Sequence, residues 1–165
     1  MEATVNKDLA AGKLEVIREF KAPLAFVWKA WTDPQLLDQW WAPHPWRCET
    51  KSMDFEVGGK WIYEMVGPNG ERHGALQIFG EIEHHHFYSG KDAFADAEGN
   101  INEQLPVATW RNTFQATPNG TRVTIVAQYP TPEALSTVLE MGMEEGLKQA
   151  QRGLDELLGK MKVVA

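Results

Sequence analysis

The sequence predicts an α+β fold in which a curved antiparallel sheet of about six or seven strands wraps around one long C-terminal helix. Apolar residues recur with helical periodicity between Thr131 and Gly159. Before that segment, stretches of alternating polar and apolar residues are separated by turn signals, including Pro-Asn-Gly at 68–70 and at 118–120. Helical patterns interrupt these stretches only after the first one, where two short helices are expected.

The N-terminal part of the chain supplies the first strand and both short helices. Residues 1–12 are polar and rich in alanine, and we expect them to form a loose segment. Residues 13–21 alternate as a strand does. Pro23 and Pro34 then each stand where proline favours the first turn of a helix. The two short helices would support one end of the sheet.

The remaining strands should follow one another along the chain. They are expected at 46–55, 60–66, 75–82, within 84–94, at 107–116 and at 121–129. Since short turns join most of these segments, neighbouring strands should pair in antiparallel fashion, and the sheet must bend around a single helix.

The long helix has recognisable ends. Thr131 can act as its N-cap, Pro132 suits the first helical position, and Gly159 is expected to stop it. Residues 160–165 would then form a short tail.

Three glycines, Gly142, Gly146 and Gly153, fall close together on the apolar side of this helix. Each costs roughly 1 kcal/mol of helix stability relative to alanine. Two explanations are open: tryptophan side chains from the sheet fill the notches, or the notches leave room for a ligand.

Composition limits the classes of function. The 165 residues suffice for one domain, which we place at 13–159. The formal charge of −7 argues against nucleic-acid and anionic-membrane partners. A single cysteine, Cys48, excludes an internal disulfide and fits a reducing compartment. Since no apolar run has the length of a signal peptide or a membrane span, we expect a cytoplasmic protein.

Five short motifs follow in an order that resembles a known family. They are Trp40-Trp41-Ala42-Pro43, Gly58-Gly59-Lys60-Trp61, Gly67-Pro68-Asn69-Gly70, Gly120-Thr121-Arg122-Val123-Thr124 and Gly142-Met143-Glu144-Glu145-Gly146. The chain is similar to bacterial proteins related to the C-terminal domain of the activator of heat-shock protein 90 ATPase. These belong to the START-like (SRPBCC), helix-grip superfamily, which includes polyketide cyclases. The resemblance covers residues 13–159 and implies a helix-grip domain that holds a small apolar ligand between sheet and helix.

Aromatic and small residues are the expected lining of such a cavity. The candidates alternate onto one face of a strand or lie on the apolar side of the helix. The predicted ligand-binding residues are Trp61, Tyr63, Met65, Trp110, Asn112, Phe114, Leu139, Gly142, Met143 and Gly146. The alternative is that the same aromatic residues simply fill the core.

The leading hypothesis is therefore binding of a small hydrophobic or aromatic molecule, without catalysis, cofactor or metal. One alternative is a cyclase- or hydrolase-like enzyme that acts in the same cavity. Another is a chaperone-activator-like interaction module with a chaperone partner. The sequence leaves a homodimer open.

Groups able to transfer protons would be needed for the enzymatic alternative. The candidates are Tyr63, Glu81, His86, Asp92 and Arg111. Glu81 and Arg111 could equally form an ion pair on the surface. His84 and His86 would share one face of a strand, but two ligands are too few for a metal site.

Overall fold

The computed structural model describes residues 3–96, 98–105 and 107–164, without the side chains of 162–164. The strands are β1 (Thr4–Asp8), β2 (Lys13–Phe20), β3 (Arg47–Met53), β4 (Lys60–Val66), β5 (Arg72–Glu83), β6 (Phe87–Phe94), β7 (Ala108–Thr117) and β8 (Gly120–Gln128). The helices are α1 (Leu24–Thr32), α2 (Pro34–Trp40), α3 (Pro132–Glu140) and α4 (Met143–Val164).

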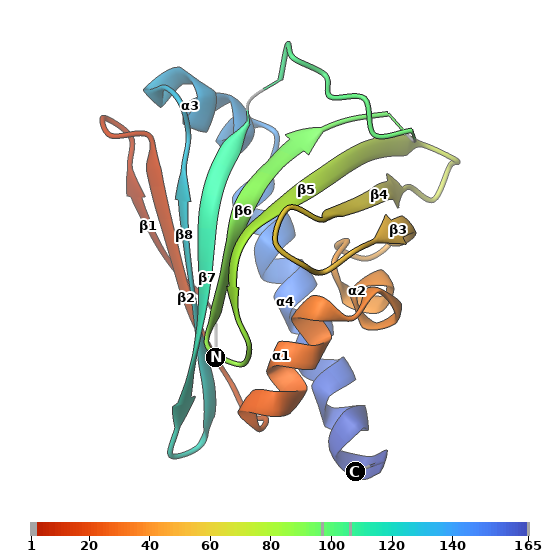
Figure 1. Ribbon diagram of the computed structural model, residues 1–165, viewed down its shortest axis with the longest axis vertical. Helices are drawn as coiled ribbons and strands as arrows, with labels where there is room; N and C mark the ends of the chain where they lie inside the picture. The colour runs from red at the N-terminus through yellow and green to blue at the C-terminus, as the bar shows by residue number, and fades with distance from the viewer. Residues whose placement is uncertain (1–2, 97, 106, 165) are drawn as a thin grey trace.

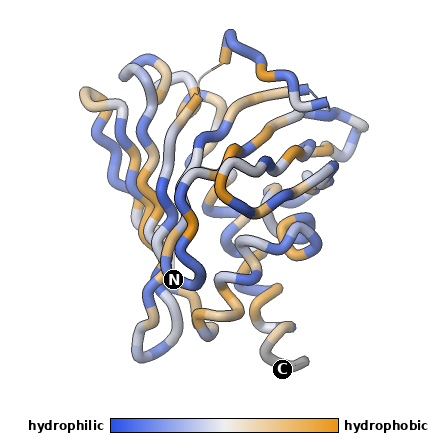
Figure 2. The backbone as a smooth tube through the Cα atoms, viewed as in Figure 1, coloured by the Kyte–Doolittle hydropathy of each residue, from blue (hydrophilic) through white to orange (hydrophobic). Residues whose placement is uncertain are grey.

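One curved antiparallel sheet wraps around α4, and α1 and α2 support one end of it (Figure 1). The strand order is β1-β2-β8-β7-β6-β5-β4-β3. Hydrophobic and hydrophilic residues alternate along the strands (Figure 2), as expected of a sheet with one buried face. The predicted α+β helix-grip class is confirmed.

The sheet has eight strands, so the expected number of six or seven was too low. The additional strand, β1, lies in the segment that we expected to be loose. It pairs with β2 through the backbone, with Val5 opposite Val16. Most of its side chains are exposed, so it shows none of the apolar alternation by which a strand is recognised. Residues 1 and 2 of that segment lie outside the described residues.

The C-terminal helical region is divided into two helices. Thr131 caps α3 as predicted, because its hydroxyl accepts a hydrogen bond from the Ala134 amide at 3.0 Å. The chain then turns at Gly142, whose φ of +87° lies in the left-handed region that favours glycine. Gly142 therefore separates α3 from α4 instead of lying within one continuous helix.

Helix α4 does not stop at Gly159, in contrast to the expected helix end and tail at 160–165. It continues to Val164, and residue 165 lies outside the described residues. Leu158 is buried and Met161 packs against the core. These contacts on both sides of Gly159 outweigh the roughly 1 kcal/mol cost of an exposed helical glycine.

A buried arginine holds α4 against the sheet. Arg18 of β2 is 3% exposed and donates to both carboxylate oxygens of Asp155, at 2.8 and 2.5 Å. It also donates to the Gln151 carbonyl oxygen at 3.2 Å. Because guanidinium and carboxylate meet in a two-bond fork, the pair fixes the position of the helix along the strand as well as its distance from it.

The short helices are tied to their surroundings by specific contacts. Asp33 caps α2, because its carboxylate accepts a hydrogen bond from the Gln35 amide at 2.9 Å. In α2, the carboxylate of Asp38 accepts hydrogen bonds from the amide and the hydroxyl of Thr50 in β3, at 3.0 and 2.5 Å. In α1, the buried Trp28 ring packs against the sheet, with its centroid 5.0 Å from that of Phe114 and 5.7 Å from that of Tyr88. The α1 end of the domain is consequently well filled.

Candidate functional site

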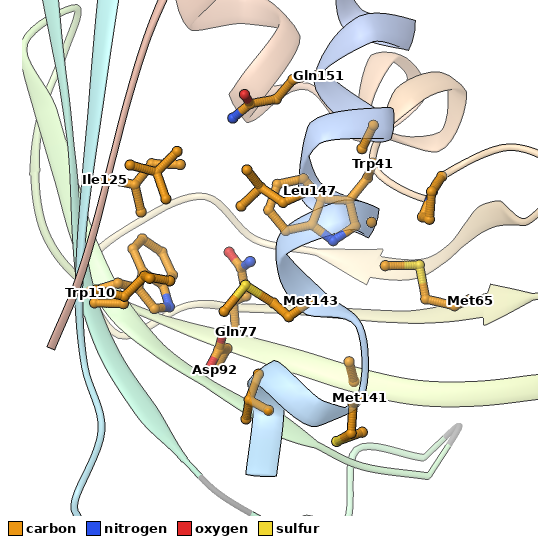
Figure 3. A pocket seen from close by; sticks show the side chains of 18 of the residues that line it. Trp41, Met65, Gln77, Asp92, Trp110, Ile125, Met141, Met143, Leu147 and Gln151 are labelled. Carbon is orange, nitrogen blue, oxygen red and sulfur yellow. The ribbon is translucent and has the colours of Figure 1, made fainter. Parts of the chain in front are cut away.

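A cavity of about 430 Å³ lies between the concave face of the sheet and the helical side of the domain. Figure 3 shows Trp110 and Ile125 of the sheet facing Met143 and Leu147 of α4 across this space. Most of the lining is apolar, and seven of the lining residues are aromatic. The aromatic residues are Trp31, Trp40, Trp41, Tyr63, Phe94, Trp110 and Tyr129.

Small residues explain why this end of the domain is hollow. Six alanines and glycines line the cavity where larger side chains would fill it: Ala75, Ala93, Ala127, Gly142, Gly146 and Ala150. A Cβ at Gly146 would lie 3.7 Å from Pro43, an ordinary contact, so the backbone alone does not require this glycine. Its effect is to leave space.

The two explanations offered for the helix glycines can now be compared. Gly142 and Gly146 line the cavity, whereas Gly153 does not. A notch filled by tryptophan exists in the sheet, because a Cβ at Gly90 would lie 3.2 Å from the Trp110 indole. The space beside Gly142 and Gly146, by contrast, is part of the cavity.

Seven of the ten predicted ligand-binding residues line the cavity. These are Tyr63, Met65, Trp110, Asn112, Gly142, Met143 and Gly146. They come from β4, β7, the turn at Gly142 and the start of α4, which include segments far apart in the sequence. Their contact with a ligand stays a prediction.

Three predicted residues lie elsewhere. Trp61 is 1% exposed, behind Tyr63, on whose ring it stacks at 4.0 Å. Phe114 lies in the filled end against Trp28. Leu139 does not reach the cavity, because α3 ends near it and turns Val138 and Met141 toward the lining instead.

Three polar residues of the lining, Gln77, Tyr129 and Gln151, were missed, whereas Asp92 was among the proton-transfer candidates. Gln77 of β5 pairs in register with Asp92 of β6, and both side chains border the cavity. Gln151 enters from α4 and Tyr129 from the residue after β8. A polar side chain on the buried face breaks the apolar alternation, so sequence reading assigns it to the outer face. Extending the alternation Ala75, Gln77, Phe79 through the glutamine would have found it.

Asp92 is the only charged residue among the described residues that line the cavity. Its side chain is partly accessible because it borders the cavity, but protein surrounds it on the other sides. Burial raises the pKa of its carboxyl from 3.8 to about 6, against an opposing effect of the amides of Ala108 and of Asp92 itself. The group is therefore mainly ionised at neutral pH and mainly protonated below pH 6.

Two tyrosine hydroxyls share this environment. Burial, and after it the charge of Asp92, raises the pKa of both Tyr63 and Tyr129 above the usual value of 10. Both hydroxyls hence stay protonated and can donate hydrogen bonds. The Tyr63 oxygen already accepts one from the Trp41 indole N–H at 3.2 Å.

Buried polar atoms without a hydrogen-bond partner are concentrated here. Four such side-chain atoms occur among the described residues: Nε1 of Trp31, Nε1 of Trp110, Oδ1 of Asn112 and Oε1 of Gln151. All four residues line the cavity. Since unpaired buried polar groups destabilise a fold and are rare, their gathering at one place marks this region as unlike the rest of the interior.

The proposed proton-transfer residues separate into two groups. Tyr63 and Asp92 line the cavity, whereas Glu81, His86 and Arg111 are exposed outside it. Arg111 forms a surface ion pair with Glu81 at 3.5 Å, which is the alternative expected for these two residues.

The three consecutive histidines do not lie in a strand as expected. They form the turn between β5 and β6, where His85 has a φ of +66°. His84 and His86 therefore do not share a strand face. Among the residues described, no group of three or more His, Cys, Asp or Glu side chains is arranged to hold a metal ion.

Comparison with known proteins finds a matching family and several solved structures that are similar to this chain. Residues 21–159 match the family described as "Activator of Hsp90 ATPase homolog 1-like protein". The crystal structure of protein Ms6760 from Mycobacterium smegmatis is 36% identical, with a TM-score of 0.87 and coverage of 94% of this chain and 96% of that chain.

Two further solved structures are similar over almost the whole chain. The solution structure of a protein from Arthrobacter aurescens is 34% identical, with a TM-score of 0.89 over 95% of this chain and 91% of that one. Protein NE0264 from Nitrosomonas europaea is 30% identical, with a TM-score of 0.79 over 93% and 98%. No curated protein matches the chain. Among the described helices, none combines the length and apolar character needed to cross a membrane.

Proposed function

The chain belongs to the Activator of Hsp90 ATPase homolog 1-like family, and we propose that it binds a small hydrophobic or aromatic molecule in the cavity beneath its sheet. The observation that carries this proposal is the cavity itself, about 430 Å³ in volume with aromatic walls. That volume is within the range of about 300–1,000 Å³ typical of small-molecule sites.

The lining suits an apolar ligand whose shape is not closely prescribed. Met65, Met141 and Met143 contribute flexible, polarisable side chains that adapt to different outlines. Tryptophan and tyrosine rings supply large rigid surfaces against which a planar molecule can stack.

A path into the cavity lies at the break between α3 and α4. Met141 lines the cavity and is 55% exposed, so it reaches both the interior and the solvent. Gly142, beside it, is also exposed and lines the cavity.

The first test is native mass spectrometry of the freshly purified protein, followed by solvent extraction of anything bound. In parallel, titration with the neutral fluorescent probe N-phenylnaphthylamine reports whether the cavity takes up an aromatic molecule. Gly146→Leu should abolish uptake while the protein stays folded, because the new side chain projects from the cavity wall.

Gly153→Leu is the matched control. It places the same side chain on the same helix, at a position that does not line the cavity and has open space around it. Uptake should survive this change. If Gly146→Leu binds the probe as the unchanged protein does, or if neither a bound molecule nor probe uptake is found, the proposed site is wrong.

A second candidate, a cyclase- or hydrolase-like catalyst in the same cavity, is favoured by Asp92. A carboxyl with a pKa of about 6 can exchange protons near neutral pH, and Tyr63 supplies a donor in the same cavity. The test is to incubate any extracted molecule with the protein and follow its mass. Turnover that depends on pH and is lost in Asp92→Asn and Tyr63→Phe would favour catalysis over binding alone.

The family's name also suggests a chaperone-activating role. Such a role needs an exposed surface for the partner, whereas the exposed large apolar residues described here lie in four separate loops. They are Leu9, Val57, Ile101 and Met141. A stimulated heat-shock protein 90 ATPase rate on addition of this chain would favour that role.

A further inference from the structure

The lining of the cavity contains a negatively charged residue but no positively charged one. Within the described lining, Asp92 is the one acidic residue, and neither lysine, arginine nor histidine is present. Arg18 is a buried cation outside this lining, and its guanidinium donates hydrogen bonds to Asp155 and to the Gln151 carbonyl oxygen. The Asp92 carboxylate therefore has no positively charged partner within the described lining.

The polar groups around Asp92 are neutral. Gln77 lies opposite it on β5, and Ala108 pairs with it on β7. In Figure 3 the side chains of Asp92, Gln77 and Trp110 gather at one part of the cavity, with Met143 of α4 facing them. The hydroxyl-bearing rings of Tyr63 and Tyr129 are near enough for the charge of Asp92 to raise their pKa values.

Aromatic rings form much of the remaining wall. The faces of indole and phenol rings carry partial negative charge and attract cations. Trp41, Tyr63, Trp110 and Tyr129 all line the cavity with Asp92. One carboxylate among several electron-rich rings is the arrangement by which proteins bind organic ammonium groups.

Resting on the proposed function, we infer that the ligand is an organic cation: an apolar or aromatic molecule that carries a protonated amine, which pairs with Asp92. A carboxylic acid of similar shape would add a second negative charge to a cavity without a cation. A neutral molecule would leave the carboxylate without a cation in an apolar cavity. A buried unpaired charge is higher in free energy than a buried charge that is paired. The net charge of −7 on the whole chain favours the same ligand class.

This inference makes binding depend on the ionisation of Asp92. With a pKa of about 6, the carboxyl is almost fully charged near pH 8 and about one tenth charged near pH 5. Tyr63 and Tyr129, the other titratable groups that border the cavity, stay protonated over this range because their pKa values are raised. Amine affinity should therefore fall about tenfold between these two pH values.

Three indole compounds of similar size test the inference by isothermal titration calorimetry: tryptamine, tryptophol and indoleacetate. They present a cation, a neutral hydroxyl and an anion on the same ring system. Near pH 8, tryptamine should bind at least about tenfold more tightly than tryptophol, and indoleacetate most weakly, a tenfold change being about 1.4 kcal/mol. Tryptamine alone should weaken on acidification.

Two variants test whether the preference for the amine, and its pH dependence, come from the Asp92 carboxylate. Asp92→Asn should reduce tryptamine affinity by about tenfold or more and remove its pH dependence. Glu81→Gln is the control, because it makes the same change of charge on an exposed residue of β5 outside the cavity. Glu81→Gln should leave the affinity for tryptamine and its pH dependence unchanged.

The outcomes separate this inference from the proposed function. If tryptamine and tryptophol bind equally, or indoleacetate binds best, the cavity is a binding site but its ligand is not an amine. If N-phenylnaphthylamine binds and none of the indoles does, the amine inference is likewise overturned. If the naphthyl probe also fails to bind, the proposed function itself falls.

Discussion

The two ends of the space between the sheet and α4 differ in how they are filled. At the α1 end, Trp28 packs edge-on against Phe114 at 5.0 Å and against Tyr88 at 5.7 Å, and Leu154 is fully buried. At the α3 end, the same helix presents Gly146 and Ala150 to a cavity of about 430 Å³.

Two features of the chain create the difference. Helix α1 places Trp28 against Phe114 and Tyr88 of the sheet at one end, whereas α3 contributes only Val138 to the lining at the other end. The break at Gly142 then redirects α3, so that the chain covers this end without filling it. The comparison teaches that close packing in a helix-grip fold is local: one end can stabilise the domain while the other is left free for a ligand.

Truncating a large residue at each end gives the largest expected contrast. Phe114→Ala should lower the free energy of unfolding by about 4 kcal/mol, because it opens a new cavity in close-packed surroundings. Met143→Ala should cost about 1 kcal/mol, since its side chain already borders open space and loses fewer contacts. Urea denaturation of the two variants provides the measurement. Equal losses would contradict the distinction between a filled and a hollow end.

The pH dependence of stability sharpens the comparison, because the hollow end contains a carboxyl with a raised pKa. The folded pKa of Asp92, about 6, lies above the ordinary 3.8. Its contribution to stability is therefore complete below about pH 4 and is lost as the pH rises through 6. A shift of this size corresponds to at most about 3 kcal/mol.

Asp92→Asn should remove that loss, so the variant should gain stability relative to the unchanged protein as the pH rises from about 4 to 8. Urea denaturation of both proteins across this range isolates the effect, because the other carboxyls titrate equally in both. These include Glu49, Asp96 and Glu144, whose pKa values are lowered by their hydrogen-bond partners. A constant difference in stability would show that the cavity does not desolvate the carboxyl.

The smallest effects concern the two glycines of the cavity wall, for which the same substitution should act in opposite directions. Gly142→Ala should destabilise the protein by about 1 kcal/mol, because its left-handed backbone strains any residue with a Cβ. Gly146→Ala should stabilise it by up to about 1 kcal/mol, because alanine favours a helix and its Cβ meets only an ordinary contact. Thermal unfolding measures both changes, and a shift of the same sign would mean that Gly142 is not required by the turn.

Much of the fold was predictable because its signals are local. The Asp33 and Thr131 caps, the two Pro-Asn-Gly turns and the alternation of Trp61, Tyr63 and Met65 depend on residues a few positions apart. Strand β1 was missed because its exposed side chains leave no such pattern, and its pairing with β2 is made by the backbone.

The site was predictable in part. Residues that are both apolar and inward, such as Met65 and Trp110, follow from periodicity. Asp92 and Gln77 are harder to place in this way, because a polar residue on a buried face interrupts the apolar alternation. Gln77 is found only when the alternation of Ala75 and Phe79 is extended through it. Phe114 has the right orientation but lies at the filled end, and nothing in its own strand reveals which end that is.

The sequence by itself determined the class of the fold and the sets of strand residues that share a face, since both depend on neighbours along the chain. It left open which face of each strand is directed inward. Only the tertiary structure decided that α1 fills one end of the interior, that Gly142 ends one helix and precedes another, and that Asp92 stands as the one charge in the described cavity wall. These features depend on where distant segments meet and on the volume left between them. Packing in three dimensions, and not local propensity, sets that volume.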